Sequence, residues 1–467
     1  MSEKTKSELL KEQLFYKNDN GLMTKSQEEI EKSFAFCDDY KTFLDVAKTE
    51  REAAAEVIKR AKSKGFAEFD KSKRYKSGDK FYVNNRDKSV ILCVMGKKPL
   101  SEGVRIAAAH IDSPRIDLKP NPLYEQDELA LFKTHYYGGI KKYQWTCVPL
   151  SLHGVIIKAN GEKVSVTIGE DENDPQFIIT DLLPHLAKEQ SQRKLGEGIT
   201  GEELNILVGS MPFKDDEASE SVKLNIMKIL NEKYGIVEED FLSAELELVP
   251  AAKAKDIGFD RSLIGAYGHD DRVCAYPEMI AAFETENPEK TTVTIFADKE
   301  ETGSDGNTGL NSSFLEYFIH HLAVNQSTDG AVVFENSECL SADVNAAFDP
   351  TFSNVFEKKN ASFINHGAVI TKYTGGRGKS GTSDATAEFM GKVRAFLNNA
   401  DVTWQTGELG KVDEGGGGTV AMYIANLGAD VVDLGVPVLS MHAPYEVVSK
   451  YDVYACYKAV KAFFEQK

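Results

Sequence analysis

The sequence has few cysteines and no long hydrophobic stretch, and both absences exclude whole classes of protein. Its six cysteines are scattered, and no two form a Cys-x-x-Cys pair. We therefore expect neither a cysteine-based structural zinc site nor a disulfide framework. Apolar runs such as 104–109 are far shorter than the ~18 residues that a membrane span needs. No apolar signal segment follows the first residues, so we expect a cytoplasmic location and no membrane partner.

Basic residues are also scarce relative to acidic ones. The chain of 467 residues carries 55 lysines and arginines against 73 aspartates and glutamates, a formal net charge of −18. A surface of this sign repels phosphate backbones, so nucleic acid is not an expected partner. Hydrophobic residues make up 42% of the chain, which is typical of a globular protein with a sizeable core. At roughly 100–200 residues per domain, the length predicts about two to four domains.

The apolar pattern predicts two kinds of region. Residues 27–64 have helical spacing, and after residue 255 short apolar runs alternate with amphipathic segments. This alternation predicts an α/β sandwich built on a central sheet. Strands are expected at 90–95, 104–109, 292–297, 331–334, 340–344, 368–371 and 431–434. Helices are expected at 272–284, 308–322, 384–398 and 451–466.

The middle of the chain differs from both ends. Between 154 and 168, two alternating runs flank Asn160-Gly161, which is the strongest short-range signal for a β-hairpin. Acidic and glycine-rich loops surround this hairpin. We therefore expect a separate β-rich domain over residues 120–250. It would be inserted into a discontinuous domain made of residues 1–119 and 251–467.

Ligand-type side chains follow the expected strands, and ligands in α/β sheets gather at the carboxyl ends of strands. His110 follows the run 104–109, and Asp112 two residues later could hold its other ring nitrogen. A histidine that merely ends a buried strand is the plainer interpretation of that pair alone. Asp270 and Asp271 open an expected helix. A bridging role between two metals would relieve their repulsion, but an exposed helix N-cap explains them equally well.

Four further acidic or imidazole side chains occupy similar places. Glu300 and Glu301 follow the strand 292–297, so one could bind a metal while the other takes a proton from water; a solvated acidic loop is the alternative. Asp343 lies in an otherwise apolar expected strand, where aspartate is depleted. His442 follows another apolar run. Taken alone, it is better interpreted as a histidine of the core.

Taken together, these side chains form a hard set of oxygen and nitrogen donors. Two histidines, two aspartates and a glutamate suit a pair of Zn²⁺ or related divalent ions better than an iron–sulfur cluster or copper. Such a pair would clamp a carbonyl group and lower the pKa of a water molecule to near neutrality. The pattern therefore predicts metal-assisted hydrolysis of an amide bond.

The order of these motifs resembles the aspartyl aminopeptidase and vacuolar aminopeptidase I family of dizinc metallo-aminopeptidases. The motifs are His-x-Asp, Asp-Asp-Arg, Glu-Glu-x-Gly-Ser, an aspartate in a strand and Ser-Met-His, from about residue 105 to the end. Smaller agreements are Tyr137-Gly138-Gly139-Ile140, Leu183-Pro184-His185-Leu186 and Asp433-Leu434-Gly435. The resemblance implies a zinc-peptidase three-layer α/β/α sandwich with an inserted β-rich dimerisation and substrate-gating domain. It also implies a homo-oligomer, a dodecamer built from dimers.

Carried over residue by residue, the resemblance implies two metal sites. One would use His110, Asp270 and Asp343, and the other Asp270, Glu301 and His442, with Asp270 as the bridge. Two ions per subunit are implied, with Zn²⁺ as the expected metal and Mn²⁺ or Co²⁺ as possible substitutes.

The resemblance also implies three catalytic roles. Glu300 would be the general base, Asp112 the partner of the first histidine ligand, and His185 the histidine that reaches into a neighbouring subunit's active site. The implied activity is removal of N-terminal residues from peptides with free N-termini. A related two-metal deacylase or carboxypeptidase, and a catalytically inactive scaffold of a self-assembling particle, are the alternatives. Glycines in the segment 372–379 leave the family's pocket lysine unplaced, so acidic and neutral N-terminal residues are both open as substrates.

Overall fold

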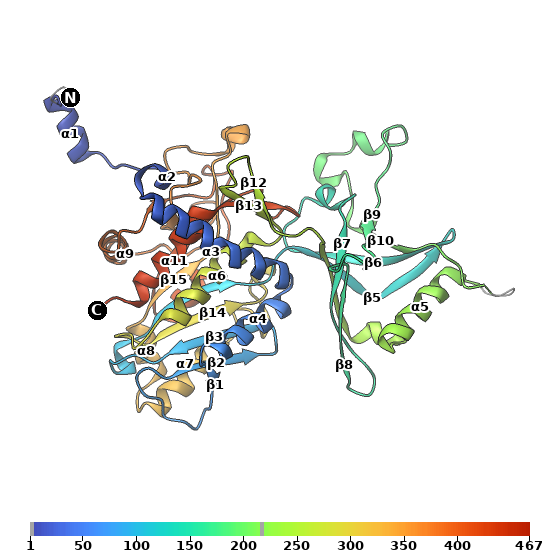
Figure 1. Ribbon diagram of the computed structural model, residues 1–467, viewed down its shortest axis with the longest axis horizontal. Helices are drawn as coiled ribbons and strands as arrows, with labels where there is room; N and C mark the ends of the chain where they lie inside the picture. Colours follow the sequence, from blue (N-terminus) through green and yellow to red (C-terminus); the bar gives the residue numbers. More distant parts are fainter. Residues whose placement is uncertain (1–3, 215–218) are drawn as a thin grey trace.

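The computed structural model describes residues 4–214 and 219–467 of the protein. Figure 1 shows two parts: a body in which helices surround a large sheet, and a β-rich part that extends to one side of it. The N-terminal helix α1 (Lys6–Leu14) projects away from the body. Of the residues in the described ranges, none forms a helix long and apolar enough to cross a membrane. The cytoplasmic location stays a prediction.

A nine-stranded sheet forms the centre of the body. Its strands are, in spatial order, β1 (Ala67–Glu68), β2 (Lys80–Asn85), β3 (Ser89–Val94), β14 (Thr292–Ala297), β4 (Arg105–His110), β15 (Glu338–Ala342), β19 (Asp430–Gly435), β17 (Ala368–Thr371) and β18 (Trp404–Thr406). Side chains alternate between the two faces of a strand. In β3, Leu92 accordingly packs on one face, while Ile91 and Cys93 pack on the other.

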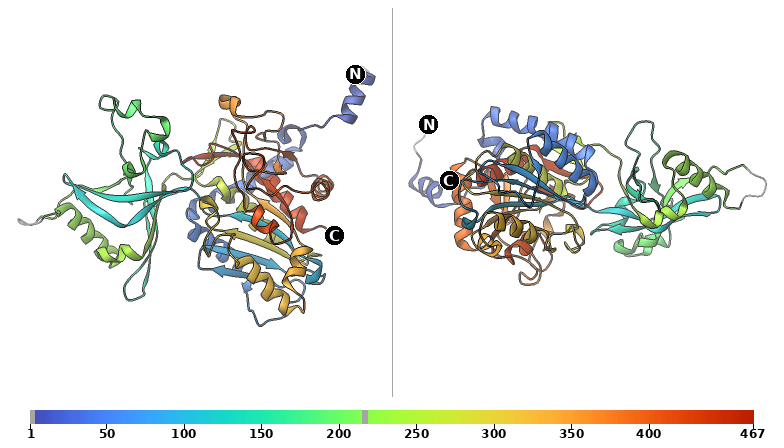
Figure 2. Two further views of the ribbon diagram at one scale, coloured as in Figure 1. Left: turned by 180° about the vertical axis from the view of Figure 1, so that it is seen from behind. Right: turned by 90° about the horizontal axis from the view of Figure 1, so that it is seen from below.

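Helices cover both faces of this sheet (Figure 2). The first face carries α3 (Gln27–Val46), α4 (Glu50–Ser63), α6 (His269–Glu284), α9 (Ala387–Asn399) and α11 (Lys450–Phe464). The second face carries α7 (Phe314–Asn325), α8 (Gly330–Glu335) and α10 (Ala421–Ala425). A short helix, α2 (Gly21–Thr24), precedes α3. The body is therefore a three-layer α/β/α sandwich, as the sequence predicts.

Parallel strands bring three of the predicted site segments to one edge of the sheet. β14, β4 and β15 are neighbours and run parallel, with Ala297 opposite His110 in the register of β14 and β4. Glu300 and Glu301 begin a short 3₁₀ turn just beyond β14, and Asp343 comes directly after β15. The fold therefore delivers these carboxylates and the histidine to neighbouring strand ends.

A five-stranded sheet, which the sequence does not predict, positions the other two ligand candidates. Its strands in order are β12 (Lys255–Ile257), β13 (Leu263–Ala266), β21 (Glu446–Ser449), β20 (Pro437–Leu439) and β16 (Asn345–Ala346). Asp270 lies at the start of α6, just after β13, and His442 lies in the connection between β20 and β21. Because β13 and β21 pair, segments far apart in sequence approach each other.

The β-rich part contains a seven-stranded sheet formed by residues 115–250. Its strands in order are β8 (Lys163–Ile168), β7 (Leu150–Ile157), β11 (Ala244–Pro250), β5 (Arg115–Gln126), β6 (Leu129–Tyr137), β10 (Ile206–Gly209) and β9 (Ile178–Ile179). The predicted hairpin is confirmed, since β7 and β8 pair in antiparallel register around Asn160-Gly161. Helix α5 (Ser221–Tyr234) packs on this sheet. The role of this part in dimerisation stays a prediction.

Two sequence-based expectations are wrong in detail. The expected strand 331–334 is part of helix α8, which Asp329 caps by accepting a hydrogen bond from the Ala331 N–H. Four apolar residues in a row fit a buried helix as well as a strand, and periodicity cannot separate the two. Asp343 follows β15 instead of lying inside it. The strands expected at 292–297 and 368–371 are confirmed as β14 and β17.

Candidate metal centre

The five predicted metal ligands and Glu300 come together in the folded chain. Their ligand atoms form three overlapping groups in which all atoms lie within 4.8 Å of one another. The groups are His110, Asp270 and Asp343; His110, Glu300 and Glu301; and Asp270, Glu301 and His442. The first and third groups share Asp270, which therefore lies in the middle of the arrangement.

Asp270 lies between the two imidazoles. Its Oδ1 is 3.1 Å from Nε2 of His110, and its Oδ2 is 3.2 Å from Nε2 of His442. The backbone of Asp270 is held on both sides. Its N–H donates to Oε2 of Glu446 at 3.0 Å, and its carbonyl oxygen accepts from Ser113 Oγ at 2.6 Å. One carboxylate with each oxygen facing a different histidine is the geometry of a bridging ligand.

Two buried polar atoms among the described residues of the centre lack a hydrogen-bond partner. Nε2 of His110 makes no hydrogen bond of acceptable geometry within the described ranges, despite its short distance to Asp270, and neither does Oε1 of Glu301. The Nε2 atom also lies 3.9 Å from Asp343 Oδ1 and 3.7 Å from Glu300 Oε2. An unpaired buried polar atom is costly. A metal ion bound by these atoms would remove that cost.

Negative charge dominates the centre. Burial, followed by repulsion from Glu300, raises the pKa of Asp343 well above its usual value. Burial, followed by repulsion from Asp270, does the same for the pKa of Glu301. Burial and the neighbouring carboxylates raise the pKa of Glu300 to about 7. Buried carboxylates without cations are destabilising, so divalent ions fit this donor set.

The two histidines are fixed through their second ring nitrogens. Nδ1 of His110 lies 3.0 Å from the backbone oxygen of Asp112 and 3.3 Å from its Oδ1. The Asp112 carboxylate also accepts hydrogen bonds from the N–H groups of Glu300 and Glu301, at 3.1 and 3.2 Å. Nδ1 of His442 lies 2.7 Å from the backbone oxygen of Gly139. Metal-binding histidines typically donate their second N–H to an oxygen in this way.

Known proteins match both the sequence and this fold. A family model described as "Aminopeptidase I zinc metalloprotease (M18)" matches residues 43–464. The chain belongs to the M18 family of zinc metallo-aminopeptidases. A probable M18 family aminopeptidase 1 of Clostridium acetobutylicum is 51% identical over 446 residues, covering 93% of this chain and 95% of that protein.

Solved structures agree with this assignment. The crystal structure of an M18 aminopeptidase from Thermotoga maritima has a TM-score of 0.91 and 44% identity, covering 97% of this chain and 100% of that one. A yeast structure described as the mApe1 dodecamer has 21% identity and a TM-score of 0.75, covering 94% and 98% of the two chains. The yeast protein supports the fold alone. Membership in the M18 family makes this chain a metallo-aminopeptidase, a hydrolase of peptide bonds.

Glu446 is a part of this M18 centre that sequence reasoning missed. It is buried on β21, and Oε1 accepts a hydrogen bond from the His442 N–H at 2.7 Å while Oε2 accepts from Asp270 N–H. One carboxylate therefore fixes the backbone at two ligand candidates. A glutamate in the apolar run Glu446-Val-Val is the same signal that drew attention to Asp343, and it marks Glu446 equally well.

His185 lies apart from these groups in the M18 chain. It is exposed, in the segment between β9 and β10 of the seven-stranded sheet, and it belongs to none of the ligand groups formed by the described residues. The flanking Leu183 and Leu186 are 49% and 69% exposed. The role implied for this histidine concerns a neighbouring subunit, so its position in one chain neither supports nor opposes that role.

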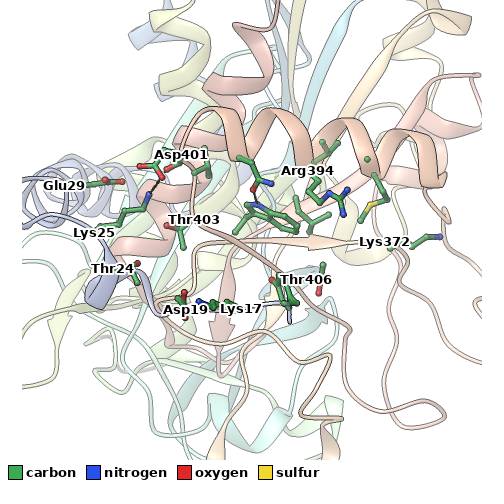
Figure 3. Close-up of a pocket in the computed structure, with 18 of the residues that line it drawn as sticks. Lys17, Asp19, Thr24, Lys25, Glu29, Lys372, Arg394, Asp401, Thr403 and Thr406 are labelled. Atoms are coloured by element: carbon green, nitrogen blue, oxygen red, sulfur yellow. Dashed lines mark hydrogen bonds and ion pairs between the residues drawn. The ribbon is translucent and has the colours of Figure 1, made fainter. Parts of the chain in front are cut away.

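A cavity of about 1080 Å³ lies elsewhere in the body (Figure 3). It is bounded by the segment before α3, by helix α9 and by strand β18. Lys25 pairs with Asp401 at its wall, with 2.6 Å between Nζ and Oδ1. Its lining, as far as the chain is described, includes none of the residues of the metal centre. The cavity is therefore separate from the candidate metal centre.

Proposed function

We propose that this M18 aminopeptidase removes single N-terminal residues from peptides with two divalent metal ions. His110, Asp270 and Asp343 would hold one ion, and Asp270, Glu301 and His442 the other. The observation that carries the proposal is the position of Asp270, whose two oxygens lie 3.1 and 3.2 Å from the two histidines. Nitrogen and oxygen donors of this kind suit Zn²⁺, and Mn²⁺ or Co²⁺ can occupy similar sites.

Bound ions would supply Lewis acidity, which polarises the scissile carbonyl and makes a water molecule more acidic. Glu300 is the proposed general base. Its carboxylate takes a proton from the attacking water as the new C–O bond forms, and passes it to the amine as the C–N bond breaks. Asp112 accepts the Glu300 N–H at 3.1 Å, which holds the base beside His110. Glu301, one residue on, is left to bind metal.

His185 is proposed to act in a neighbouring subunit. Leu183 and Leu186, on both sides of it, are exposed, and contact with a partner subunit would bury them. The homologous yeast protein is described as a dodecamer, and we propose a homo-oligomer built from dimers for this chain. In that assembly His185 would donate a hydrogen bond to the developing oxyanion in the partner's site. The seven-stranded sheet would then serve in dimerisation and in gating the substrate.

A panel of peptides tests this activity and its alternatives. The metal-free protein is loaded with Zn²⁺, Mn²⁺ or Co²⁺ and given fluorogenic amino-acid amides and unlabelled peptides, both with free or blocked N-termini, and the products are identified by mass. Hydrolysis restricted to free N-termini is expected. Release of the blocking group would instead indicate a deacylase, and release of C-terminal residues a carboxypeptidase. Bound metal without any hydrolysis would indicate an inactive scaffold. Acidic and neutral residues in the panel decide the substrate preference.

A further inference from the structure

One short loop beside the seven-stranded sheet contacts His442 and Asp112, the carboxylate next to His110. Tyr137 ends strand β6, and Gly138 and Gly139 follow it, so that residues 137–139 reach back to the body. The Tyr137 hydroxyl donates to Oδ2 of Asp112 at 2.8 Å, and the carbonyl oxygen of Gly139 accepts from Nδ1 of His442 at 2.7 Å. Asp112 in turn contacts Nδ1 of His110. Both histidines are therefore oriented by oxygens that this loop provides or holds.

Tyr137 is itself held rigidly. The guanidinium of Arg115 lies 3.9 Å from the centre of its ring, an arrangement favoured by the ring quadrupole. Arg115 is buried and pairs with Glu50 of α4, Asp117 of β5 and Glu247 of β11, at 3.2, 2.8 and 3.2 Å. The support of the tyrosine therefore comes from the sandwich and the seven-stranded sheet together.

A side chain at either glycine of the loop would press against a neighbouring side chain. A Cβ on Gly138, whose φ is +77°, would lie 3.1 Å from Oε2 of Glu301. A Cβ on Gly139 would lie 3.3 Å from Nδ1 of His442. The backbone of the loop is thus packed directly against two proposed ligands of the second ion.

We propose that the loop 137–139 positions the two imidazoles for metal binding, so that the seven-stranded sheet is a structural part of the metal centre. Tyr137 is a positioning residue that acts through Asp112, and the Gly139 carbonyl acts on His442 directly. With each Nδ1 engaged, each Nε2 faces Asp270. This inference rests on the proposed function, because it concerns how the proposed ligands are oriented.

The first test is Tyr137→Phe, which removes one hydroxyl and keeps the ring beside Arg115. Loss of an outer partner of a metal-binding histidine typically weakens metal affinity by about 10–100-fold. We expect a weakening of that order for Zn²⁺ in competition with a chelator, and a lower kcat with little change in KM. Tyr136→Phe is the matched control, since Tyr136 is the preceding residue of β6 and is 38% exposed.

The second test is Gly139→Ala, which presses a methyl group against His442. We expect one of the two bound Zn²⁺ ions to be lost at a lower chelator concentration than in the wild type. Gly196→Ala is its control, because a Cβ there meets no atom within 4 Å. Thermal unfolding of the metal-free variants separates a general loss of stability from a change in metal binding.

The outcomes separate this inference from the proposed function. A wild-type protein that binds two ions and cleaves peptides, with both variants binding Zn²⁺ as tightly as the wild type, would overturn the inference alone. A lower unfolding temperature with unchanged metal affinity would also overturn it, since it would reveal a purely structural loop. A wild-type protein that binds no divalent ion would overturn both proposals. Selective weakening in both variants, with unchanged controls, would support the inference.

Discussion

The two large sheets differ in what they contribute to the metal centre. The nine-stranded sheet and the small sheet beside it deliver every proposed ligand found in the described residues, together with Glu300. The seven-stranded sheet delivers no proposed ligand from its described residues, yet its loop touches Asp112 and His442. Parallel strand ends thus supply His110, Glu301 and Asp343, and the small sheet supplies Asp270 and His442. The proposal assigns the orientation of the histidines to the added sheet, which also carries His185. The proposed ligands and the loop that contacts their surroundings therefore come from different regions of the chain.

Removal of the shared ligand should have the largest effect on activity. Asp270→Ala takes one oxygen from each proposed site, so we expect both ions and all measurable peptide hydrolysis to be lost together. Metal content and activity of the same sample provide the measurement. Asp271→Asn is the control. Asp271 is buried and accepts a hydrogen bond from the His110 N–H at 3.3 Å, and the variant should keep both ions. Loss of metal in the control alone would show that the neighbouring aspartate is the bridge.

Removal of the proposed general base, Glu300, should have the second-largest effect on activity. Glu300→Gln removes the proton acceptor and keeps the size of the side chain. A positioned acid or base is worth roughly 10²–10⁴ in rate, so kcat should fall by about that factor while both ions and the KM are retained. Steady-state kinetics on metal-analysed protein checks this. Turnover close to the wild-type value would remove Glu300 from the mechanism.

His185 tests whether the second region acts in a partner's site. Loss of one oxyanion donor costs on the order of 10²–10³ in rate, so His185→Ala should lower kcat by about that factor with metal content unchanged. Mixing this variant with Glu300→Gln under conditions of subunit exchange should restore part of the activity. One site of such a mixed dimer pairs an intact Glu300 with the partner's intact His185. Proven exchange without recovery would refute the role in a neighbouring subunit.

The junction between the regions should affect stability more than activity. His153 on β7 lies 2.7 Å from Glu52 of α4 and 3.1 Å from Glu170, beside the buried Lys48. Burial would lower the pKa of His153, but hydrogen bonds to Glu170 and Glu52 raise it above its usual value. The stabilisation is therefore full below about pH 6.5, the unfolded value, and is lost as the pH rises through the raised folded pKa.

His153→Gln should accordingly lower the free energy of unfolding by roughly 1.5–3 kcal/mol at pH 6, the usual worth of a hydrogen bond to a charged group. The difference from the wild type should shrink at alkaline pH, and kcat should barely change. Chemical unfolding at several pH values measures it, with the exposed His135→Gln as the control. A difference that grows with pH would show that His153 is buried in its neutral form.

The sequence predicts the sandwich better than the contacts around its active edge. Strands β14 and β17 fall at the expected residues, because most of their residues are β-branched and favour strands. Helix α8 was mistaken for a strand, since its four apolar residues lack a readable period. The ligand candidates can be identified from the sequence because each is an acidic or imidazole side chain next to an apolar run or at the start of an expected helix.

Other parts of the centre depend on contacts between distant segments. Tyr137 meets Asp112 only because β5 and β6 pair in a specific register, in which Arg115 lies opposite Tyr137. Glu446 meets Asp270 because β13 pairs with β21. No local sequence pattern encodes these strand registers. The contacts of Tyr137 and Glu446 therefore cannot be predicted from the sequence, unlike the ligand candidates. Glu446 left a trace as an acid beside apolar strand residues, and Tyr137-Gly138-Gly139 and Asp112 belong to the motifs of the family resemblance.

The central claim is that two ions share Asp270 and that hydrolysis depends on them. The most direct measurement titrates the metal-free protein with Zn²⁺ while native mass spectrometry counts ions per chain and the same samples are assayed for release of N-terminal residues. We expect saturation at two ions per chain, with activity appearing as they bind, and neither saturation nor activity in Asp270→Ala. Saturation at one ion, or full activity in the metal-free protein, would contradict it.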